Sequence, residues 1–262
     1  MKIAVAQISC VPGDAAANLH KIHEYAARAK SGGAEMIVFP EMVDTGYAMS
    51  LIPQHASPWT EGAVPKLQEI ARSLSMAVIC GVSERDASAI YNAQVCVDPS
   101  GEIIAKYRKT HLFTPPPLEE HKCFSPGTAL TTFAFQDFRL GLSICYDLRF
   151  PEVYRTLAVT NDVNVFVVSS AWPFPRVEHF QTLCLARAIE NQSYVVVANR
   201  VGTDQGVTFC GSSAIIDPYG VALATASTDQ EELLQAEISL KRVIAVRREM
   251  PVFKDRRPDL YA

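Results

Sequence analysis

Three side chains with the chemistry of a nucleophilic enzyme each follow a short apolar run of this 262-residue chain. Glu41 comes directly after a buried-strand candidate, where loss of solvent would raise its pKa and suit it to general-base work. Lys109 ends a basic cluster before apolar residues and a proline loop, and its ammonium could stabilise negative charge on an oxygen. Cys145 ends an apolar run at an expected sheet edge, where a neighbouring ammonium would lower the pKa of the thiol and favour the thiolate.

Each of the three has a plain structural alternative when it is taken alone. Glu41 could be a surface residue that begins a loop, and the cluster at residues 106–113 could be a solvated basic face. Cys145 could be a buried structural cysteine, which is the common fate of a free cysteine. The chemistry therefore depends on whether the fold brings the three side chains together.

The elements that would have to position them alternate along the chain. Helical spacing of apolar residues predicts helices over residues 14–29, 64–74, 151–160 and 177–191. Short runs rich in β-branched residues predict strands over residues 2–7, 36–39, 76–82, 91–97, 103–106, 131–135, 140–144, 163–169, 194–199, 212–216 and 233–238. Strands mixed with helices and hairpin turns favour a layered two-sheet α/β sandwich. No internal repeat or low-complexity linker interrupts it, so we expect a single domain over residues 1–262.

Taken together, the three segments resemble the nitrilase (carbon–nitrogen hydrolase) superfamily. That family has a glutamate in a hydrophobic-Pro-Glu context, a lysine in Arg-Lys-x-His-Leu-Phe and a cysteine in Cys-Tyr-Asp-x-Arg-Phe-Pro-Glu, and this chain has all three in the same order. The similarity continues through residues 169–173, 185–192 and 199–202 to the tail at residues 253–258. The resemblance implies a four-layer α-β-β-α sandwich. It also implies at least a homodimer, in which helices beside the catalytic strands meet.

The resemblance also implies a mechanism that uses no metal and no organic cofactor. Glu41 would take the proton of Cys145, and the thiolate would attack an amide carbonyl. Lys109 and the backbone N–H of Tyr146 would hold the oxyanion, and water activated by Glu41 would hydrolyse the thioester. Family members often carry a second glutamate near the lysine, for which Glu120 fits better than its neighbour Glu119.

Segments at residues 172–176, 199–202 and 255–258 look like the ω-amidase branch of the superfamily. The resemblance therefore implies a small-molecule substrate, the ω-amide of a 2-oxo dicarboxylic acid such as 2-oxoglutaramate. Such a substrate carries a carboxylate that needs a cation, for which we expect Arg176, with Trp172 as a wall of the pocket. The plainer alternative is that Arg176 caps or pairs at the start of the next helix. A nitrilase, an N-carbamoyl-amine hydrolase and a short aliphatic amidase remain alternatives because the same catalytic residues serve them.

Two functions of other classes are weaker. A non-catalytic interaction module would be expected to lose one of the three active-site residues, and all are present. A cysteine peptidase or thioesterase would want a histidine paired with the cysteine, and histidine is absent around Cys145. Other charged residues read as scaffolding: we expect Arg149 to pair with Glu152 and Arg187 with Glu190, each at i,i+3 spacing.

The composition of the chain limits its expected partners and its expected location in the cell. With a net charge of −4, a pI near 5.9 and no long basic run, nucleic acid is not an expected partner. The apolar runs are too short to span a bilayer, and residues 1–7 read as a first strand instead of a signal peptide, so we expect no membrane partner and a cytoplasmic protein. Seven cysteines without a Cys-x-x-Cys pair argue against a disulfide scaffold, and no Cys/His cluster has zinc spacing.

Overall fold

The computed structural model describes residues 1–261, whose strands form two six-stranded sheets and one small ribbon. The first sheet has the order β14 (Glu232–Glu237), β1 (Lys2–Gln7), β2 (Met36–Val38), β3 (Ala77–Asp86), β4 (Ala89–Val97) and β5 (Ile103–Arg108). The second has the order β13 (Ala222–Thr225), β12 (Ala214–Ile216), β9 (Tyr194–Asn199), β8 (Val165–Ser170), β7 (Phe138–Ile144) and β6 (Thr132–Phe135). The ribbon pairs β10 (Thr203–Asp204) with β11 (Val207–Thr208).

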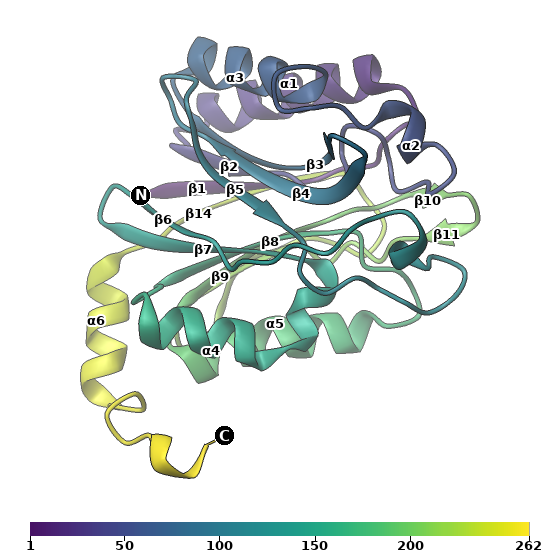
Figure 1. Ribbon diagram of the computed structural model, residues 1–262. Helices are drawn as coiled ribbons and strands as arrows, with labels where there is room; N and C mark the ends of the chain where they lie inside the picture. The colour runs from purple at the N-terminus through teal and green to yellow at the C-terminus, as the bar shows by residue number, and fades with distance from the viewer. Residues whose placement is uncertain (262) are drawn as a thin grey trace.

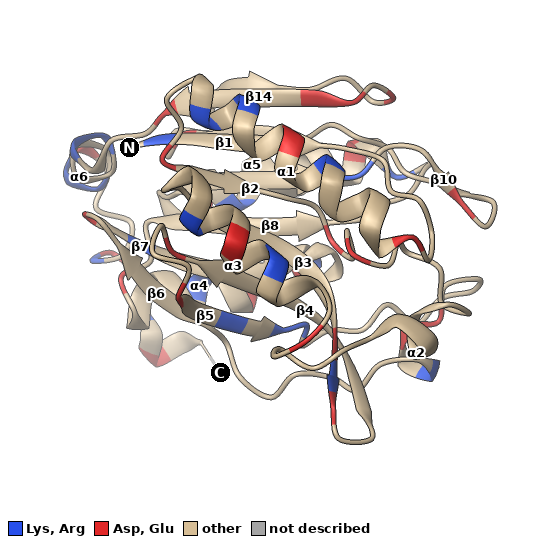
Figure 2. Ribbon diagram, turned by 90° about the horizontal axis from the view of Figure 1, so that it is seen from above, with Lys and Arg blue, Asp and Glu red and all other residues tan. Residues whose placement is uncertain are grey.

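Helices cover the outer face of each sheet, which gives the expected four-layer α-β-β-α sandwich (Figure 1). The first sheet is covered by α1 (Ala15–Ser31) and α3 (Ala63–Leu74), and the second by α4 (Pro151–Thr160) and α5 (Val177–Asn191). The remaining helices are α2 (Ile52–His55), α6 (Leu240–Glu249) and the 3-10 turns η1 (Glu120–Lys122), η2 (Cys145–Arg149) and η3 (Pro258–Leu260). Figure 2 shows acidic and basic residues interspersed along α1 and α3, as expected of a solvent-facing layer.

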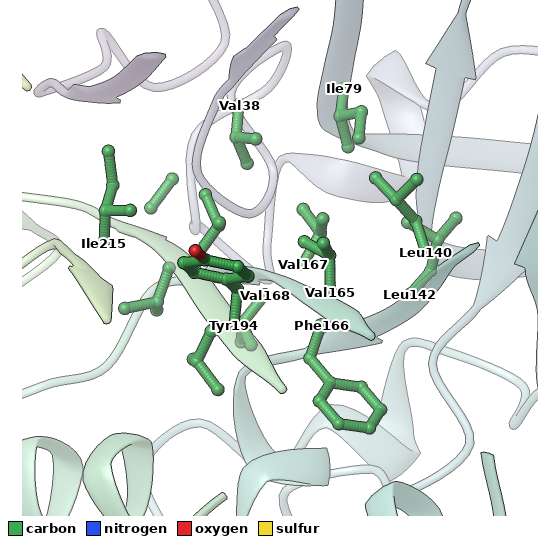
Figure 3. Close-up of a cluster of buried hydrophobic side chains, with 14 of the residues drawn as sticks. Val38, Ile79, Leu140, Leu142, Val165, Phe166, Val167, Val168, Tyr194 and Ile215 are labelled. Atoms are coloured by element: carbon green, nitrogen blue, oxygen red, sulfur yellow. The ribbon is translucent and has the colours of Figure 1, made fainter. Parts of the chain in front are cut away.

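Both faces of the central strands are buried, which explains why β1, β2, β8 and β9 read as continuous apolar runs instead of alternating ones. In β1, Ile3 and Val5 join the core that extends to the second sheet, whereas Ala4 and Ala6 join the core beneath the helices. Figure 3 shows the same alternation in β8, where Phe166 points toward the helices while its neighbours lie between the sheets.

Most predicted elements are confirmed, with ends that differ by a few residues. The structure adds α6, β13 and the β10–β11 ribbon, which the sequence analysis did not predict. The predicted strand over residues 212–216 is shorter, because only Ala214–Ile216 pairs with β9.

The strand directions gather the chemistry at one edge. In the first sheet β1, β2 and β3 are parallel, and β5 runs the same way because two antiparallel pairings separate it from β3. In the second sheet β7, β8 and β9 are parallel. The segments that leave the carboxyl ends of β2, β5, β7 and β8 are therefore the ones to search, since ligands of open α/β sheets bind outside these ends.

Candidate active site

Lys109 directly follows β5 and is completely buried between two carboxylates. Its ammonium donates to Oε1 of Glu41 and to Oε1 of Glu120, each at 2.8 Å. The amide of Asn92, on β4, donates to the same two oxygens at 2.6 and 3.0 Å. All four side chains lie at 0% exposure, so the network is closed to solvent. The structure thus brings together three residues that the sequence singled out and a fourth that it did not.

The charges of this network set its proton affinities. Burial alone would lower the pKa of Lys109, but the charges of Glu120 and Glu41 outweigh it and hold that pKa well above its usual range. Burial raises the pKa of Glu41; the Lys109 ammonium opposes this shift and the Glu120 carboxylate adds to it. Lys109 is therefore a permanent cation, while Glu41 has the raised pKa of a group able to take up a proton.

Residues of both sheets hold Glu41 in place. The N–H of Ala171, just past β8, donates to Oε2 of Glu41 at 2.7 Å. On the other side Gly81 of β3 approaches so closely that a Cβ there would lie 2.6 Å from the Cα of Glu41. Only glycine leaves room for this approach, because such a contact is far inside van der Waals distance. The carboxylate is therefore fixed in position before any ligand arrives.

Glu120, in η1, is the glutamate that reaches Lys109. Its Oε1 also accepts from the Tyr47 hydroxyl at 2.7 Å, and its Oε2 accepts from the backbone N–H of Phe113 at 2.6 Å. Glu119 instead forms a surface ion pair with Lys122 at 2.8 Å. The geometry thus separates the two glutamates that the sequence left one register apart.

Cys145 follows β7 at a sharp turn. Its φ of 44° lies in the left-handed region, which residues other than glycine rarely adopt, and it begins η2. Strain of this kind is concentrated at functional sites, where the surrounding structure holds it in place. Tyr146 is the next residue of that 3-10 turn, and the first N–H groups of a helix lack partners inside it. The Tyr146 N–H is therefore free of the helix ladder at the residue beside the thiol.

The resting state of the thiol differs from the sequence-based expectation. Burial, followed by the charge of Glu41, raises the pKa of Cys145, and the Lys109 ammonium only partly opposes this. The ammonium acts in the expected direction, but burial of the thiol and the charge of Glu41 outweigh it, so the pKa of Cys145 is raised. A thiol of this kind needs a base, and Glu41 is the group placed to act as one.

Asp147 connects the cysteine turn to the lysine strand. This buried carboxylate accepts from the N–H of Ile144 at 2.9 Å and from the hydroxyl of Tyr107 at 2.7 Å. The Nδ1 atom of His111 lies 2.8 Å from its other oxygen. One carboxylate therefore ties together residues on both sides of Lys109 and the residue before Cys145. The sequence analysis quoted Asp147 within a motif but gave it no role.

A narrow pocket lies against the Cys145 thiol. Trp172 is 2% exposed and walls this pocket, with its indole N–H donating to the carbonyl of Arg176 at 2.9 Å. Arg176, the residue expected to bind the carboxylate, lines this pocket, and so do Tyr146 and Arg149. The other lining residues are Tyr47, Phe113, Leu118, Cys145, Ala171 and Pro173.

Two guanidinium groups stand at this pocket without an acidic partner in residues 1–261. The predicted pair of Arg149 with Glu152 does not form; the Arg149 guanidinium lies 4.6 Å from the centroid of the Trp172 ring instead. Burial lowers the pKa of Arg149, and the charge of Arg176 acts in the same direction. Arg176 is the N-cap residue of α5, but its side chain makes no cap hydrogen bond. The plainer interpretation of Arg176 as a helix-start partner is therefore not what the structure shows.

The second predicted scaffold pair is confirmed. Arg187 lies 2.8 Å from Glu190, and its guanidinium also donates twice to the carbonyl of Leu148 in η2, at 3.0 and 2.8 Å. Over the described residues no group of three or more His, Cys, Asp or Glu side chains could hold a metal ion. In the same part of the chain no helix is both long and apolar enough to cross a membrane.

Two stacked sheets between helical layers, with a buried glutamate, lysine and cysteine at their strand ends, define the nitrilase superfamily of carbon–nitrogen hydrolases. The chain belongs to the carbon–nitrogen hydrolase family, which matches residues 2–248. It is 36% identical over 260 residues to the 2-oxoglutaramate amidase of Bacillus subtilis (strain 168), covering 97% of this chain and 98% of that protein. It is 33% identical over 264 residues to the omega-amidase NIT2 of Homo sapiens, covering 98% and 94%.

Solved structures give the same family. A C145S mutant of the Nesterenkonia AN1 amidase, from the nitrilase superfamily, superposes with a TM-score of 0.88 at 27% identity, over 100% of this chain and 96% of that chain. An E41Q mutant of the same amidase, in which acrylamide has added to the active site cysteine, gives a TM-score of 0.87 at 28% identity, over 100% and 98%.

Proposed function

We propose that this carbon–nitrogen hydrolase removes ammonia from the terminal amide of a short 2-oxo dicarboxylic acid monoamide such as 2-oxoglutaramate. The observation that carries the proposal is the pair of guanidinium groups, Arg149 and Arg176, that line the Cys145 pocket without acidic partners in the described residues. Unpaired cations at a partly buried site favour an anionic ligand, because their charge compensates a carboxylate for the water that it loses on binding.

Catalysis begins with proton transfer from the Cys145 thiol to the carboxylate of Glu41, whose raised pKa suits it to the task. The thiolate attacks the amide carbonyl carbon, and negative charge passes to the carbonyl oxygen. An ammonium has three N–H donors, and Lys109 uses two on its glutamates, which leaves one for the oxyanion. The N–H of Tyr146 is the second donor, and each such donor contributes about 3 kcal/mol.

Collapse of the tetrahedral intermediate breaks the C–N bond. Glu41 returns its proton to the leaving nitrogen, ammonia departs, and the acyl group remains on Cys145 as a thioester. Glu41 then takes a proton from water, the hydroxide adds to the thioester, and the carboxylic acid leaves as the thiol is restored. Glu120 stays hydrogen-bonded to Lys109, Tyr47 and Phe113 throughout and positions the cation. This sequence of steps calls for no metal and no organic cofactor.

Substrate choice depends on the pocket mouth, which is formed by Arg149 and Arg176. Arg176 binds the distal carboxylate through its planar fork, and Arg149, held over the Trp172 ring, supplies a second cation. Trp172 forms one wall of the pocket, so the short carbon chain of the substrate lies between the Cys145 thiol and the arginine pair. The names of the two relatives, a 2-oxoglutaramate amidase and an omega-amidase, support the same substrate class.

The test is a substrate panel scored for ammonia. We expect 2-oxoglutaramate and 2-oxosuccinamate to be turned over at least about a hundredfold more efficiently than hexanamide, because hexanamide lacks the carboxylate. A nitrile and an N-carbamoyl amino acid complete the panel. Preference for either of these two would move the enzyme to the nitrilase or carbamoylase branch, and preference for hexanamide would leave the arginine pair without a function.

We also propose a homodimer or larger oligomer in the cytoplasm. Ile189 of α5 is 53% exposed, with Val221 at 54% and Leu223 at 43% on the strand segment beside it, and clustered exposed apolar side chains favour association. All seven cysteines are free, as is typical of a reducing compartment. Light scattering at micromolar concentration should give at least twice the 28.7 kDa chain mass, and a purely monomeric species would contradict the assembly.

A further inference from the structure

Ser170, the last residue of β8, lies beside the nucleophile. β7 and β8 are parallel, and the last registered pair is Ile144 with Ser169, so Cys145 and Ser170 are the next residues along the two strands. The neighbouring Ser169 faces the first sheet, where its hydroxyl donates to the carbonyl of Phe39 at 2.8 Å. Strand alternation turns the Ser170 side chain to the opposite face, and a side-chain hydrogen bond from Ser170 is among the contacts that lower the pKa of the Cys145 thiol.

The Ser170 hydroxyl is buried beside the thiol and, among the described residues, makes no other hydrogen bond. Its side chain is 0% exposed, and within residues 1–261 its oxygen has no partner that meets full hydrogen-bond geometry. A buried hydroxyl without a partner costs free energy, so most such groups are satisfied. The two serines at the end of β8 therefore differ: Ser169 is fully engaged, accepting from Gln94 at 2.8 Å besides its bond to Phe39, and Ser170 is spare.

A neutral thiol explains why the hydroxyl has no hydrogen bond of full geometry to the described part of the chain in the resting enzyme. A thiol sulfur is a weak acceptor, whereas a thiolate is charged and accepts strongly. Burial raises the pKa of Cys145 most, and a hydrogen bond from Ser170 acts in the opposite direction. An interaction that strengthens only when charge develops on sulfur assists the chemical step without tightening the ground state.

We infer that the Ser170 hydroxyl is a further active-site group, which donates a hydrogen bond to the Cys145 sulfur as the thiol loses its proton to Glu41. No proton leaves Ser170; its O–H only turns toward the sulfur. The inference rests on Cys145 being the nucleophile of the proposed function, but not on the identity of the amide.

The experiment measures the rate of Cys145 alkylation by iodoacetamide against pH, with mass spectrometry reading the Cys145 peptide alone. A hydrogen bond to the thiolate stabilises the deprotonated form, so its removal raises the midpoint of the pH profile. We expect Ser170→Ala to raise that midpoint by about one pH unit and to lower kcat about tenfold with KM little changed. Ser170→Thr keeps a hydroxyl, so its kcat should stay within about threefold of the kcat of the natural protein.

Ser169→Ala is the matched control, because it removes the neighbouring hydroxyl and its two buried hydrogen bonds. It should lower the melting temperature while leaving the alkylation midpoint in place. An unchanged midpoint in Ser170→Ala, or an equal shift in Ser169→Ala, would overturn the inference. Should Ser170→Ala fold poorly, Ser170→Gly also lacks the hydroxyl and is read in the same way.

Failure of this inference is distinguishable from failure of the proposed function. If Cys145 is not the nucleophile, loss of activity in the natural protein will follow the labelling of another residue and not that of Cys145. If the substrate class is wrong, the alkylation profiles are unaffected, because iodoacetamide needs no recognition of the amide.

Discussion

The two halves of the site differ in how completely their charges are satisfied. Around Lys109, the ammonium pairs with the carboxylates of Glu41 and Glu120, and these side chains lie at 0% exposure. At the pocket mouth, Arg149 and Arg176 are partly exposed and have no acidic partner among the described residues. A network whose charges are paired before a ligand arrives serves the chemistry, and cations left unpaired serve recognition. The first half should therefore govern turnover of every amide, and the second half should govern which amide is bound.

The largest effect should come from Lys109→Ala, which breaks the sealed half. Loss of an oxyanion donor should lower kcat/KM by about a thousandfold on charged and neutral amides alike. Two buried carboxylates would then face each other without their cation, so stability should also fall by about 3–5 kcal/mol in urea unfolding. Lys106 is an exposed lysine on β5, the strand that Lys109 follows, so Lys106→Ala is the control and should change neither quantity.

Removal of Arg176 should sharpen the comparison by separating the two halves. Arg176→Ala should raise KM for 2-oxo acid monoamides about a hundredfold, as expected for loss of a charge-assisted contact, with hexanamide hydrolysed almost unchanged. Steady-state ammonia release on both amides measures this, with the exposed Arg139 changed to alanine as a control for loss of positive charge. Equal losses on the two amides would mean that Arg176 is structural.

The sealed half was largely predictable from the sequence, and the reason is physical. Glu41 and Cys145 follow the buried strands β2 and β7, which read as apolar runs, and Lys109 follows the partly exposed edge strand β5. Parallel strands then bring their carboxyl ends to one edge. Asn92 also left a trace, because it and Gln94 are polar residues two apart in an otherwise apolar strand. The sequence analysis did not use that trace.

The mouth was less predictable because its side chains follow tertiary contacts. The i,i+3 spacing favoured Arg149 with Glu152, but packing over Trp172 took the guanidinium instead. The helix α6 was missed for a related reason: of its ten residues only Val243 and Val246 are buried, so its apolar stripe is too thin to stand out. The pKa of Cys145 differs from the expectation because the sequence cannot show how deeply the thiol is buried, and burial is the largest cause that raises it.

A smaller effect should appear in the pH profile. Burial, with the Glu120 charge adding to it, raises the pKa of Glu41 above its ordinary value of 4.5. The base must be ionised to act, so kcat/KM should fall as the pH drops through that raised pKa, and the acidic limb should lie above pH 4.5. Arg176→Ala should leave the limb in place, because Arg176 is outside the buried network. A limb below pH 4.5 would show that Glu41 is not the titrating base.

The most direct test of the account is competition among the cysteines for iodoacetamide. Cys123 is partly exposed, whereas the other six cysteines are buried. Cys145 is only 7% exposed, but it lines the pocket and has Glu41 as its base. Brief labelling followed by peptide mass spectrometry should find the label first at Cys145, with activity lost in proportion. Labelling of Cys123 first, with a proportional loss of activity while Cys145 stays unmodified, would contradict the assignment of Cys145 as the nucleophile.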